Sequence, residues 1–284
     1  MCRQIGGHCM RYLFLSLLLL GLITATTVHS AALPHAGTVL AARPLQQLVG
    51  ENHLYTLDFL IFRNLAAGQL RLTAEKAPGR YRAELVANTL GLASQLTGDR
   101  TQSYVTVMEE DGTGRLRSVS HEATIHKRKN GVWNDRQKRY RFDYRAGKVY
   151  QEKGENGQFR PGLVFELPAE RQPVDILTGF YNLRTGVYGA LTPGVHLKIP
   201  TFTTKGISEI EVEVLNGPDR LADPFFPTTG TLLRIRVDPE VFDTGGADLF
   251  AWFDEAGRPA RGIVEKVIGL GNVYGHLREG QNQP

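Results

Sequence analysis

Apolar and polar side chains alternate with a period of two over much of this chain. The alternation is clearest at 69–74, 80–85, 209–214 and 232–237, where every second residue is apolar and most of its neighbours are polar or charged. Successive side chains of a strand point to opposite faces, so each segment would have one apolar and one polar face. A sheet with one face in water is usually antiparallel. We therefore expect a mainly β protein built on an antiparallel sheet.

Short turn sequences separate these segments. Asp111-Gly112, Asn130-Gly131 and Asn156-Gly157 are typical of tight connections between antiparallel strands. The segment 54–62 differs because it is apolar at both parities. We expect it to be a central strand covered on both sides. Four further pairs are interpreted as turns: Ala67-Gly68, Pro78-Gly79, Asn216-Gly217 and Ala256-Gly257.

One segment, 173–188, departs from the period of two and predicts a helix. We expect Pro173 in its first turn, Asp175 near its positively polarised start, and Gly186 at its end. A short helical segment is also expected at 45–49. The fold class that follows is a curved antiparallel sheet or incomplete barrel, with one main helix packed on or inside it. Four large apolar residues recur at helical spacing in the main helix: Ile176, Phe180, Leu183 and Val187.

The N-terminus predicts export. A leader whose only charges are Arg3 and Arg11 precedes an apolar run at 12–28, and small residues follow, as in a secretory signal peptide. We expect cleavage after Ser30 or Ala32. The alternative is a membrane anchor, but the run is shorter than the roughly 20 apolar residues that a span needs. No later segment of the sequence is long and apolar enough to span a membrane, so no transmembrane span is expected after cleavage.

Cleavage would change the composition of the chain. Cys2 and Cys9 both precede the apolar run, so the mature chain would have no disulfide and no thiol. Basic residues would fall from 33 to 31 against 29 acidic ones, which gives no argument for a nucleic-acid partner. The expected organisation is a signal peptide at 1–30, a loose leader at 31–44 and a single β-rich domain at 45–284.

No reactive motif in the sequence passes a test of spacing. His121 and His126 are five residues apart in a predicted strand, so they would point to opposite faces as surface histidines and could not share a metal. Asp243-Thr244-Gly245 resembles an aspartic-protease loop, but a second copy is needed and none is present. The glycines at 269–275 precede no helix that could bind a pyrophosphate. We expect no catalytic residue, metal or cofactor.

The most distinctive local feature is a basic hairpin around the turn Asn130-Gly131. On its second strand, aromatic and basic residues have opposite parities, so we expect an aromatic face turned inward and a basic face turned outward. An ordinary solvated face is the alternative, because Asp135 and Asp143 offset part of the charge. The functional hypothesis is contact with an anionic surface such as lipid phosphate or a wall polyanion. The residues expected to contact the anion are Lys127, Arg128, Lys129, Arg136, Lys138, Arg139 and Arg141.

Three segments, 55–72, 175–184 and 250–277, resemble a family of exported bacterial proteins known as domain of unknown function 3108. The first would be two strands around a turn at Gly68, the second is the predicted helix, and the third begins Phe-Ala-Trp-Phe-Asp. The resemblance implies a periplasmic protein with a curved sheet. The architecture that it implies is similar in outline to the incomplete barrels of lipoprotein carriers, which hold acyl chains on their concave side. The resemblance implies no catalytic residues.

The leading hypothesis is a non-enzymatic periplasmic binding or carrier module for an apolar or anionic envelope component such as lipid. An apolar ligand would lie between sheet and helix. One alternative is a scaffold or assembly factor that binds another envelope protein through a sheet edge. Another is a hydrolase whose residues only the fold brings together. The residues expected to contact the ligand are Trp133, Tyr140, Phe142, Tyr144, Phe180, Tyr181 and Trp252.

Overall fold

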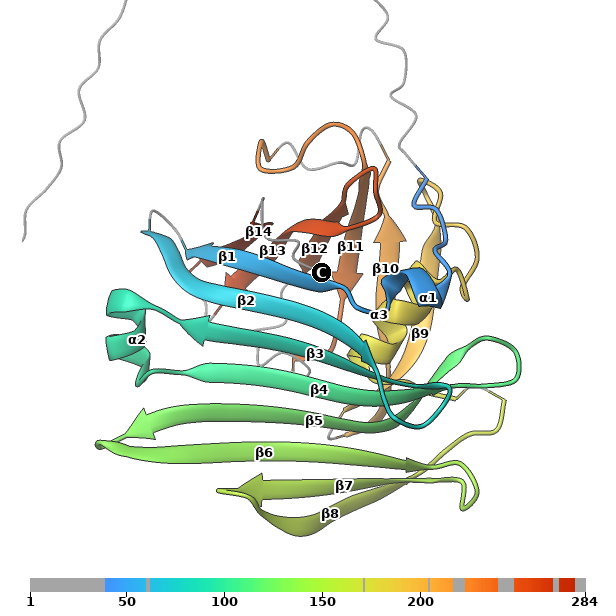
Figure 1. Cartoon of the computed structure of the whole chain (residues 1–284), viewed down its shortest axis with the longest axis horizontal. Helices are drawn as coiled ribbons and strands as arrows, with labels where there is room; N and C mark the ends of the chain where they lie inside the picture. Colours follow the sequence, from blue (N-terminus) through green and yellow to red (C-terminus); the bar gives the residue numbers. More distant parts are fainter. Residues whose placement is uncertain are drawn as a thin grey trace, which may run out of the picture. The chain divides into compact units, whose positions relative to one another are not determined.

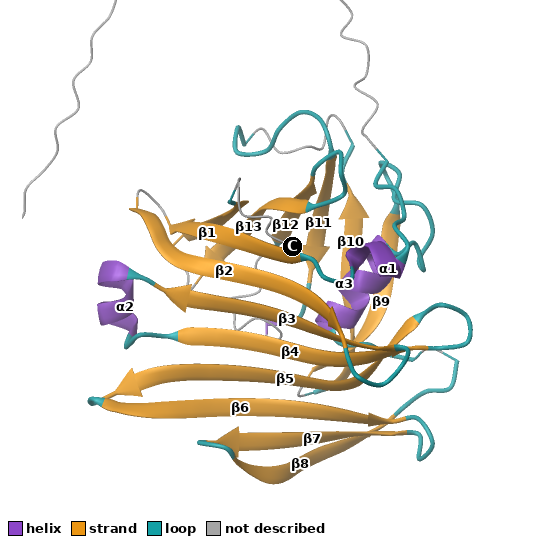
Figure 2. Cartoon of the chain, viewed as in Figure 1, coloured by secondary structure: helices purple, strands orange, loops and turns teal. Residues whose placement is uncertain are grey.

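The structure, a computed structural model, describes residues 39–59, 62–170, 172–203, 205–216, 223–239, 248–267 and 271–278. The predicted signal peptide, its cleavage positions and the segment 243–245 lie outside these residues. Within the described ranges the chain forms 14 strands in one antiparallel sheet and three helices (Figures 1 and 2). The prediction of a mainly β protein is confirmed.

The strands are consecutive neighbours except at one place, where β1 pairs with β14. The order across the sheet is therefore β8-β7-β6-β5-β4-β3-β2-β1-β14-β13-β12-β11-β10-β9. The helices are α1 (Leu45–Leu48), α2 (Gly91–Thr97) and α3 (Ile176–Arg184). The strands are β1 (Asn52–Phe59), β2 (Phe62–Ala74), β3 (Arg80–Thr89), β4 (Thr101–Glu110), β5 (Leu116–Lys129), β6 (Val132–Asp143), β7 (Lys148–Glu155), β8 (Gln158–Glu166), β9 (His196–Thr203), β10 (Gly206–Val214), β11 (Thr231–Arg236), β12 (Leu249–Phe253), β13 (Pro259–Val267) and β14 (Gly271–Leu277).

The sheet curls until its two end strands, β8 and β9, approach each other. Phe202 of β9 packs against Phe142 of β6 and Phe165 of β8, with ring centroids 5.7 and 5.8 Å apart. No backbone ladder joins β8 to β9 in the described part of the chain, so side chains rather than hydrogen bonds bridge the ends. The prediction of a curved antiparallel sheet that stops short of a barrel is confirmed.

The main helix, α3, lies where the sequence predicts it but begins later. Asp175 is the N-cap, because its carboxylate accepts hydrogen bonds from the backbone N–H groups of Leu177 and Thr178. Pro173 therefore precedes the helix instead of occupying its first turn, which corrects that prediction. Gly186, with a φ of 79°, follows the C-cap and ends the helix as expected. Figure 2 shows α1 and α3 at one end of the long strands and α2 at the other.

Most of the predicted turns lie between strands. Asn130-Gly131 and Asn156-Gly157 have positive φ at both positions, the backbone of a tight two-residue hairpin turn. Gly68 is a correction, since it lies inside β2, opposite Tyr55 and Ala87. A Cβ on Gly68 would lie 3.3 Å from Cβ of Tyr55, so this glycine admits a close side chain rather than a turn. Gly217, of the pair Asn216-Gly217, lies outside the described residues.

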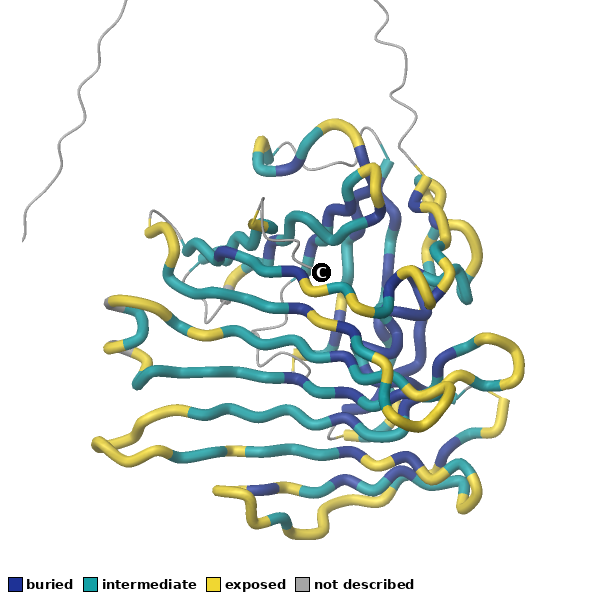
Figure 3. Tube along the Cα trace, viewed as in Figure 1, coloured by how far each residue is buried: buried dark blue, intermediate teal, exposed yellow. Residues whose placement is uncertain are grey.

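The central position predicted for 54–62 is correct for β1, which pairs with both β2 and β14. Its expected burial on both sides is wrong. Only His53 and Thr56 of β1 are buried, and the strand ends at Phe59, with β2 beginning at Phe62. The reason is that α3 covers the inner face of the long strands at one end only. Figure 3 shows buried positions gathered at that end and half-exposed or exposed ones at the other.

Leu232 at the start of β11 departs from the alternation predicted at 232–237, which holds farther along the strand, where Arg234 and Arg236 are partly exposed. Leu232 and Leu233 are neighbours, and each is 1% exposed. Leu233 faces the core around α3, whereas Leu232 packs in a second cluster with Phe226 and Phe250. A loop that carries Phe225 and Phe226 therefore covers the outer face of β11 and β12 around Leu232.

Within the described part of the chain, no helix has the length and apolar character that a membrane crossing requires.

Candidate functional site

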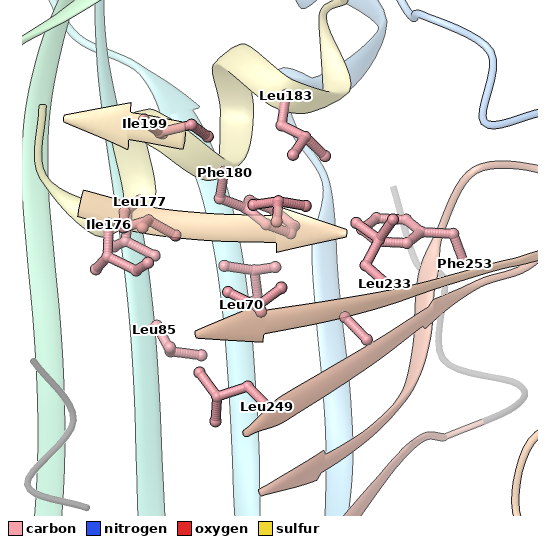
Figure 4. Close-up of a pocket in the computed structure, with 15 residues that line it drawn as sticks. Leu70, Leu85, Ile176, Leu177, Phe180, Leu183, Ile199, Leu233, Leu249 and Phe253 are labelled. Atoms are coloured by element: carbon pink, nitrogen blue, oxygen red, sulfur yellow. The ribbon is translucent and has the colours of Figure 1, made fainter. Parts of the chain in front are cut away.

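An apolar cavity of about 200 Å³ lies between α3 and the inner face of the sheet (Figure 4). Ile176 and Phe180 of α3 form one wall of this cavity. In Figure 4, Leu85 and Leu249 lie on the side away from the helix. All the side chains that line the cavity are apolar, and the space is only partly enclosed. The opposite walls come from strands at both sides of the sheet, through residues such as Leu70, Leu85, Leu233, Leu249 and Phe253.

The sequence of α3 explains why it forms this wall. Ile176, Phe180 and Leu183 recur on one helical face, and all three line the cavity. The ring of Phe180 stacks against Phe253 of β12, with centroids 6.2 Å apart. Gly179 precedes Phe180, and a Cβ there would make ordinary van der Waals contacts with Val174, Ile199 of β9 and Ile210 of β10, at 3.6 to 3.8 Å. This part of the helix therefore lies directly on β9 and β10.

A buried carboxylate anchors the start of α3. Besides the two helix N–H groups that it caps, Asp175 accepts hydrogen bonds from the hydroxyls of Thr106 at 2.7 Å and Thr178 at 2.6 Å. The hydroxyl of Ser118 also donates to Asp175, at Oδ2. Asp175 is 6% exposed, so these donors replace the water that the carboxylate loses on folding. The arrangement fixes the helix start to β4 and β5.

His121 completes this network, and its position corrects the prediction of a surface histidine. It is 8% exposed, with Nδ1 2.8 Å from Thr106 Oγ1 and 3.5 Å from Asp175 Oδ1. Burial alone would raise the pKa of Asp175, but His121, Ser118 and Thr178 lower this pKa to about 2. The carboxylate is therefore charged at neutral pH.

A β-bulge brings His121 inward. Val107 pairs with Ser120 and Met108 pairs with Ser118, so Val119 is an extra residue in β5. The bulge puts Ser118 and His121 on the same face despite their odd spacing. His126 points to the opposite face, as the five-residue spacing predicts, and its side chain is 40% exposed.

The combination of Ser118, His121 and Asp175 does not form a nucleophile with its base. Ser118 Oγ donates its hydrogen bond to Asp175 rather than to His121, whereas an activated serine needs its base within hydrogen-bonding reach. The geometry instead suits a structural anchor. No group of three or more side chains that could hold a metal is found among the residues that the structure describes.

A buried ion pair anchors the other end of α3. Arg184, 2% exposed, contacts Glu51 through both terminal guanidinium nitrogens, with Nη2 2.9 Å from Oε2. His53 lies 3.2 Å from the same carboxylate. Burial alone would raise the pKa of Glu51, but His53 and Arg184 lower it to about 2. Asp175 therefore caps the start of the helix, as its predicted position near that end suggests, and Arg184 docks the other end.

Only some of the predicted ligand contacts lie together. Phe180 lines the apolar cavity, and Tyr140 and Phe142 line a smaller pocket of about 50 Å³. Ile176 borders both spaces, so the two are neighbours. Asp175 also lines the smaller pocket, as does Lys138, one of the predicted anion contacts, so charges of both signs border that space.

The other predicted contacts lie elsewhere. Tyr181 is fully buried on the side of α3 that packs against β2 to β4. Trp252 lies on the outer face of β12, where its Nε1 donates to the carbonyl of Thr229 at 2.8 Å. Tyr144 donates to the carbonyl of Ser118, and Trp133 is 42% exposed near the turn of the β5–β6 hairpin. These four line neither space, although ligand contact by any of the seven stays a prediction.

On the second strand of the hairpin the expectation is confirmed, because Tyr140 and Phe142 face inward and Arg139 and Arg141 face outward. Taken together, however, the basic residues of the hairpin divide between its two faces. Arg128, Arg139 and Arg141 share the outer face with Trp133. The remaining four alternate with them and share the inner face with His121 and Tyr140: Lys127, Lys129, Arg136 and Lys138.

The outer arginines of the strand centre are paired. Arg139 lies 2.7 Å from Glu122 and 3.8 Å from Glu152, and Arg141 lies 3.2 Å from Glu152. Each glutamate is a cross-strand neighbour, so these charges largely cancel on the sheet surface. Lys127, Arg128 and Lys129 lie beyond these ion pairs, next to the hairpin turn.

Sequence reasoning missed the strand side of the cavity. Leu70, Leu85 and Leu233 had the inward parity that alternation predicts, and that signal was correct. Nothing local indicates that β3 and β11, distant in the sequence, face each other across one space. The pairing of β1 with β14 creates that arrangement.

Comparison with known proteins gives a family and a structural neighbour. A family model described as "Protein of unknown function (DUF3108)" matches residues 54–278. One similar solved structure is that of a β-barrel-like protein of domain of unknown function DUF1849 from Brucella abortus. The two chains are 12% identical, with 84% of this chain and 98% of that chain covered and a TM-score of 0.46. No curated protein matches this chain.

Proposed function

This chain belongs to the DUF3108 family, whose description assigns no activity, and from its site we propose that it is a non-enzymatic binding or carrier module for an apolar component of the cell envelope. The ligand's buried part would occupy the cavity between α3 and the sheet. The N-terminal leader supports a periplasmic location, where lipid acyl chains are the most abundant apolar groups.

The observation that carries this proposal is the apolar lining of the cavity. Side chains around a void lose the dispersion contacts that a filled core would provide, so an apolar guest would restore them. An engineered apolar cavity of about 150 Å³ in another protein stays dry and binds benzene. The present cavity, about 200 Å³, is of that order. It is below the roughly 300–1,000 Å³ of drug-sized sites, which favours one acyl chain segment or a small hydrophobic compound.

The anchoring of α3 at both of its ends also supports binding. Asp175 anchors one end of α3 and Arg184 the other, each through buried charged hydrogen bonds. A wall fixed in this way loses little conformational freedom when a ligand binds, which favours affinity. The polar groups nearest the cavity are engaged in these anchors, and this arrangement favours binding over chemistry.

A substitution that fills the cavity tests the proposal. Ala251 lines the cavity, and Ala251→Phe would occupy part of the space without removing an anchor. We expect this variant to take up added fatty acid at least roughly tenfold more weakly, because a ligand of one acyl chain gains most of its affinity by burying apolar area. Native mass spectrometry of protein purified from its own envelope should show a bound lipid that the variant lacks.

The matched control is Ala146→Phe, which adds the same ring on an exposed turn and should leave uptake unchanged. Protein recovered free of ligand that also takes up no added fatty acid would count against the proposal. If Ala251→Phe leaves the uptake of fatty acid unchanged, the ligand binds outside this cavity.

A second candidate function is a scaffold that binds another envelope protein by strand addition. Strand β8 is an edge of the sheet, and its Leu163 and Val164 are 52% and 54% exposed. Exposed apolar edges are sites where a further strand can pair. A stoichiometric protein partner in a periplasmic pull-down, lost on Val164→Lys, would favour this function over the first.

A further inference from the structure

Exposed apolar side chains gather where the long strands end away from α3. Phe62 begins β2, Leu90 precedes α2, and Val132 and Trp133 begin β6. Their exposed fractions are 52%, 38%, 70% and 42%. Isolated exposed apolar residues are ordinary, but several at neighbouring strand ends indicate an interaction surface. We call these four residues, with Lys127, Arg128 and Lys129, the open rim.

Backbone contacts place these strand ends next to one another. The N–H of Leu90 donates to the carbonyl of Leu65 in β2 at 2.7 Å, and that of Arg128 in β5 donates to Gly98 after α2 at 2.6 Å. The β1–β2 end, α2 and the β5–β6 hairpin therefore form one continuous border, seen at the left of Figure 1.

The hairpin presents a supported indole. The Trp133 ring stacks on His126 with centroids 4.2 Å apart, and the guanidinium of Arg128 lies 4.8 Å from its centroid. These contacts orient the ring while leaving much of it in water. Tryptophan has an apolar body with a polar N–H, and it is enriched where proteins meet the membrane interface.

The charge of the same hairpin is positive. Three consecutive basic residues, Lys127, Arg128 and Lys129, precede the turn, and no acidic residue occurs from 127 to 134. Three carboxylates contact this part of the hairpin: Asp99 lies 3.7 Å from Arg128, Asp135 pairs with His126, and Glu155 accepts a hydrogen bond from Asn134 at 3.0 Å. Arg128 is therefore partly neutralised by Asp99, whereas no ion pair of Lys127 or Lys129 is found among the residues that the structure describes.

We propose that the open rim docks on an anionic phospholipid surface. Val132 and Trp133 enter the interface between head groups and acyl chains, and Lys127, Arg128 and Lys129 face the lipid phosphates. Stable peripheral binding requires two such signals, apolar insertion and electrostatic attraction, and the hairpin supplies both. This docking does not depend on whether the cavity binds a ligand.

The rim and the cavity are nevertheless connected through the sheet. Leu249, which lines the cavity, pairs with Val264, which pairs with Val273, which pairs with Phe59 at the end of β1. Phe59 in turn pairs with Phe62 of the open rim. The Leu249 side of the cavity and the rim therefore lie in one register row. Docking would bring that side of the cavity toward the lipid.

Vesicle flotation tests the proposal. The full-length protein, as its expression host processes it, is mixed with vesicles of phosphatidylcholine alone or with phosphatidylglycerol added. We expect binding only to the anionic vesicles and loss of binding at high salt, because salt screens exposed charges. Val132→Ser with Trp133→Ser, and separately Lys127→Gln with Lys129→Gln, should each weaken binding at least roughly tenfold.

Matched controls separate the rim from general surface properties. Leu163→Ser with Val164→Ser removes two equally exposed apolar residues from β8, and Lys198→Gln with Arg236→Gln removes two exposed basic residues from β9 and β11. Both should bind as the unchanged protein does. Trp133 and the buried Trp252 are the two tryptophans, so a blue shift of fluorescence that Trp133→Phe abolishes reports insertion directly.

Absence of vesicle binding would overturn the proposal, as would binding that the rim variants leave unchanged. If the rim variants change only the sedimentation of the protein in solution, the rim is an interface between copies of the chain and the membrane proposal fails.

Discussion

The two ends of the long strands differ although they belong to the same sheet. At the end covered by α3, Leu72, Met108 and Leu116 are fully buried. At the other end the inner positions of the same strands include Ala66, Ala87 and Gln102, which are half-buried. Alternation is clear at the covered end, at 69–74 and 80–85, and weaker at the other end, where the inward positions include the polar Gln102. The parity of a strand determines which face a side chain points to, whereas the elements packed on that face determine whether it is buried.

Charged groups show the same contrast. Near α3, the carboxylate of Asp175 is buried and that of Glu51 is largely buried, and both accept hydrogen bonds that hold the helix in place. At the open rim, Lys127 and Lys129 are exposed and lie beside exposed apolar residues. Substitutions at the covered end should therefore change stability, and those at the rim should change interactions.

The largest effect on stability is expected from Asp175→Ala. This change removes the helix cap and the acceptor of three buried hydroxyls, so we expect a loss of about 4 kcal/mol in the free energy of unfolding. Urea unfolding followed by circular dichroism measures it. Asp143→Ala, which removes an exposed turn acceptor, should cost below about 1 kcal/mol. Similar losses in both variants would contradict the role assigned to the anchor.

Arg184→Met should be the next most destabilising change. It leaves the buried carboxylate of Glu51 without its main counter-charge, at a cost of about 3 kcal/mol. Adding Glu51→Gln should recover part of this loss, because the stranded charge is then removed. The exposed pair of Arg141 and Glu152 provides the comparison, since Arg141→Met should cost at most about 1 kcal/mol. No recovery in the double variant would argue against coupling between Glu51 and Arg184.

Stability should also fall in acid. Asp175 and Glu51 have folded pKa values of about 2, below their ordinary values of 3.8 and 4.5. Groups with lowered pKa stabilise the fold above their ordinary pKa, and this contribution is lost as pH falls toward the folded pKa. We expect each to contribute about 2–3 kcal/mol that disappears between about pH 4.5 and 2. Unfolding midpoints across this range should change less in Asp175→Asn and in Glu51→Gln, and an unchanged slope would refute the assignment.

The smallest effect on stability is expected at the rim. Val132→Ser should change the free energy of unfolding by less than about 0.5 kcal/mol, because the side chain is 70% exposed. Leu72→Ser, at the covered end of β2, should cost several times more, since large-to-small changes of buried leucine cost about 2–5 kcal/mol. Thermal unfolding of the two variants measures the difference. A rim variant as unstable as Leu72→Ser would remove the contrast between the two ends.

Local patterns in the sequence predicted much of the fold. Alternation and turn residues predicted an antiparallel sheet, and helical spacing predicted α3 with Asp175 near its start. These features depend on neighbouring residues only. Gly68 was misinterpreted because a glycine that admits the side chain of Tyr55 from the next strand has the same local appearance as one in a turn.

The candidate site was harder to predict because it depends on contacts between distant segments. Phe180 was identified from its helix, but the helical stripe did not show that Tyr181 faces the opposite cluster. Trp252 was predicted to contact a ligand, and the structure places it in the outer cluster with Phe226, away from both cavities. Burial on the outer face of a strand leaves no period-two signal, so these positions required the structure.

Because Val119 is an extra residue in β5, the strand can lose this residue without a change in the faces of the residues that follow. If Val119 were deleted, Ser118 and Ser120 would become ordinary neighbours, and every side chain from His121 to Lys129 would keep its present face. A deletion a few residues later, at Ala123, would rotate the rest of the strand by one position and turn Trp133's partner Arg128 inward. Length variation in this strand should therefore concentrate at residue 119, with a flatter sheet as its consequence.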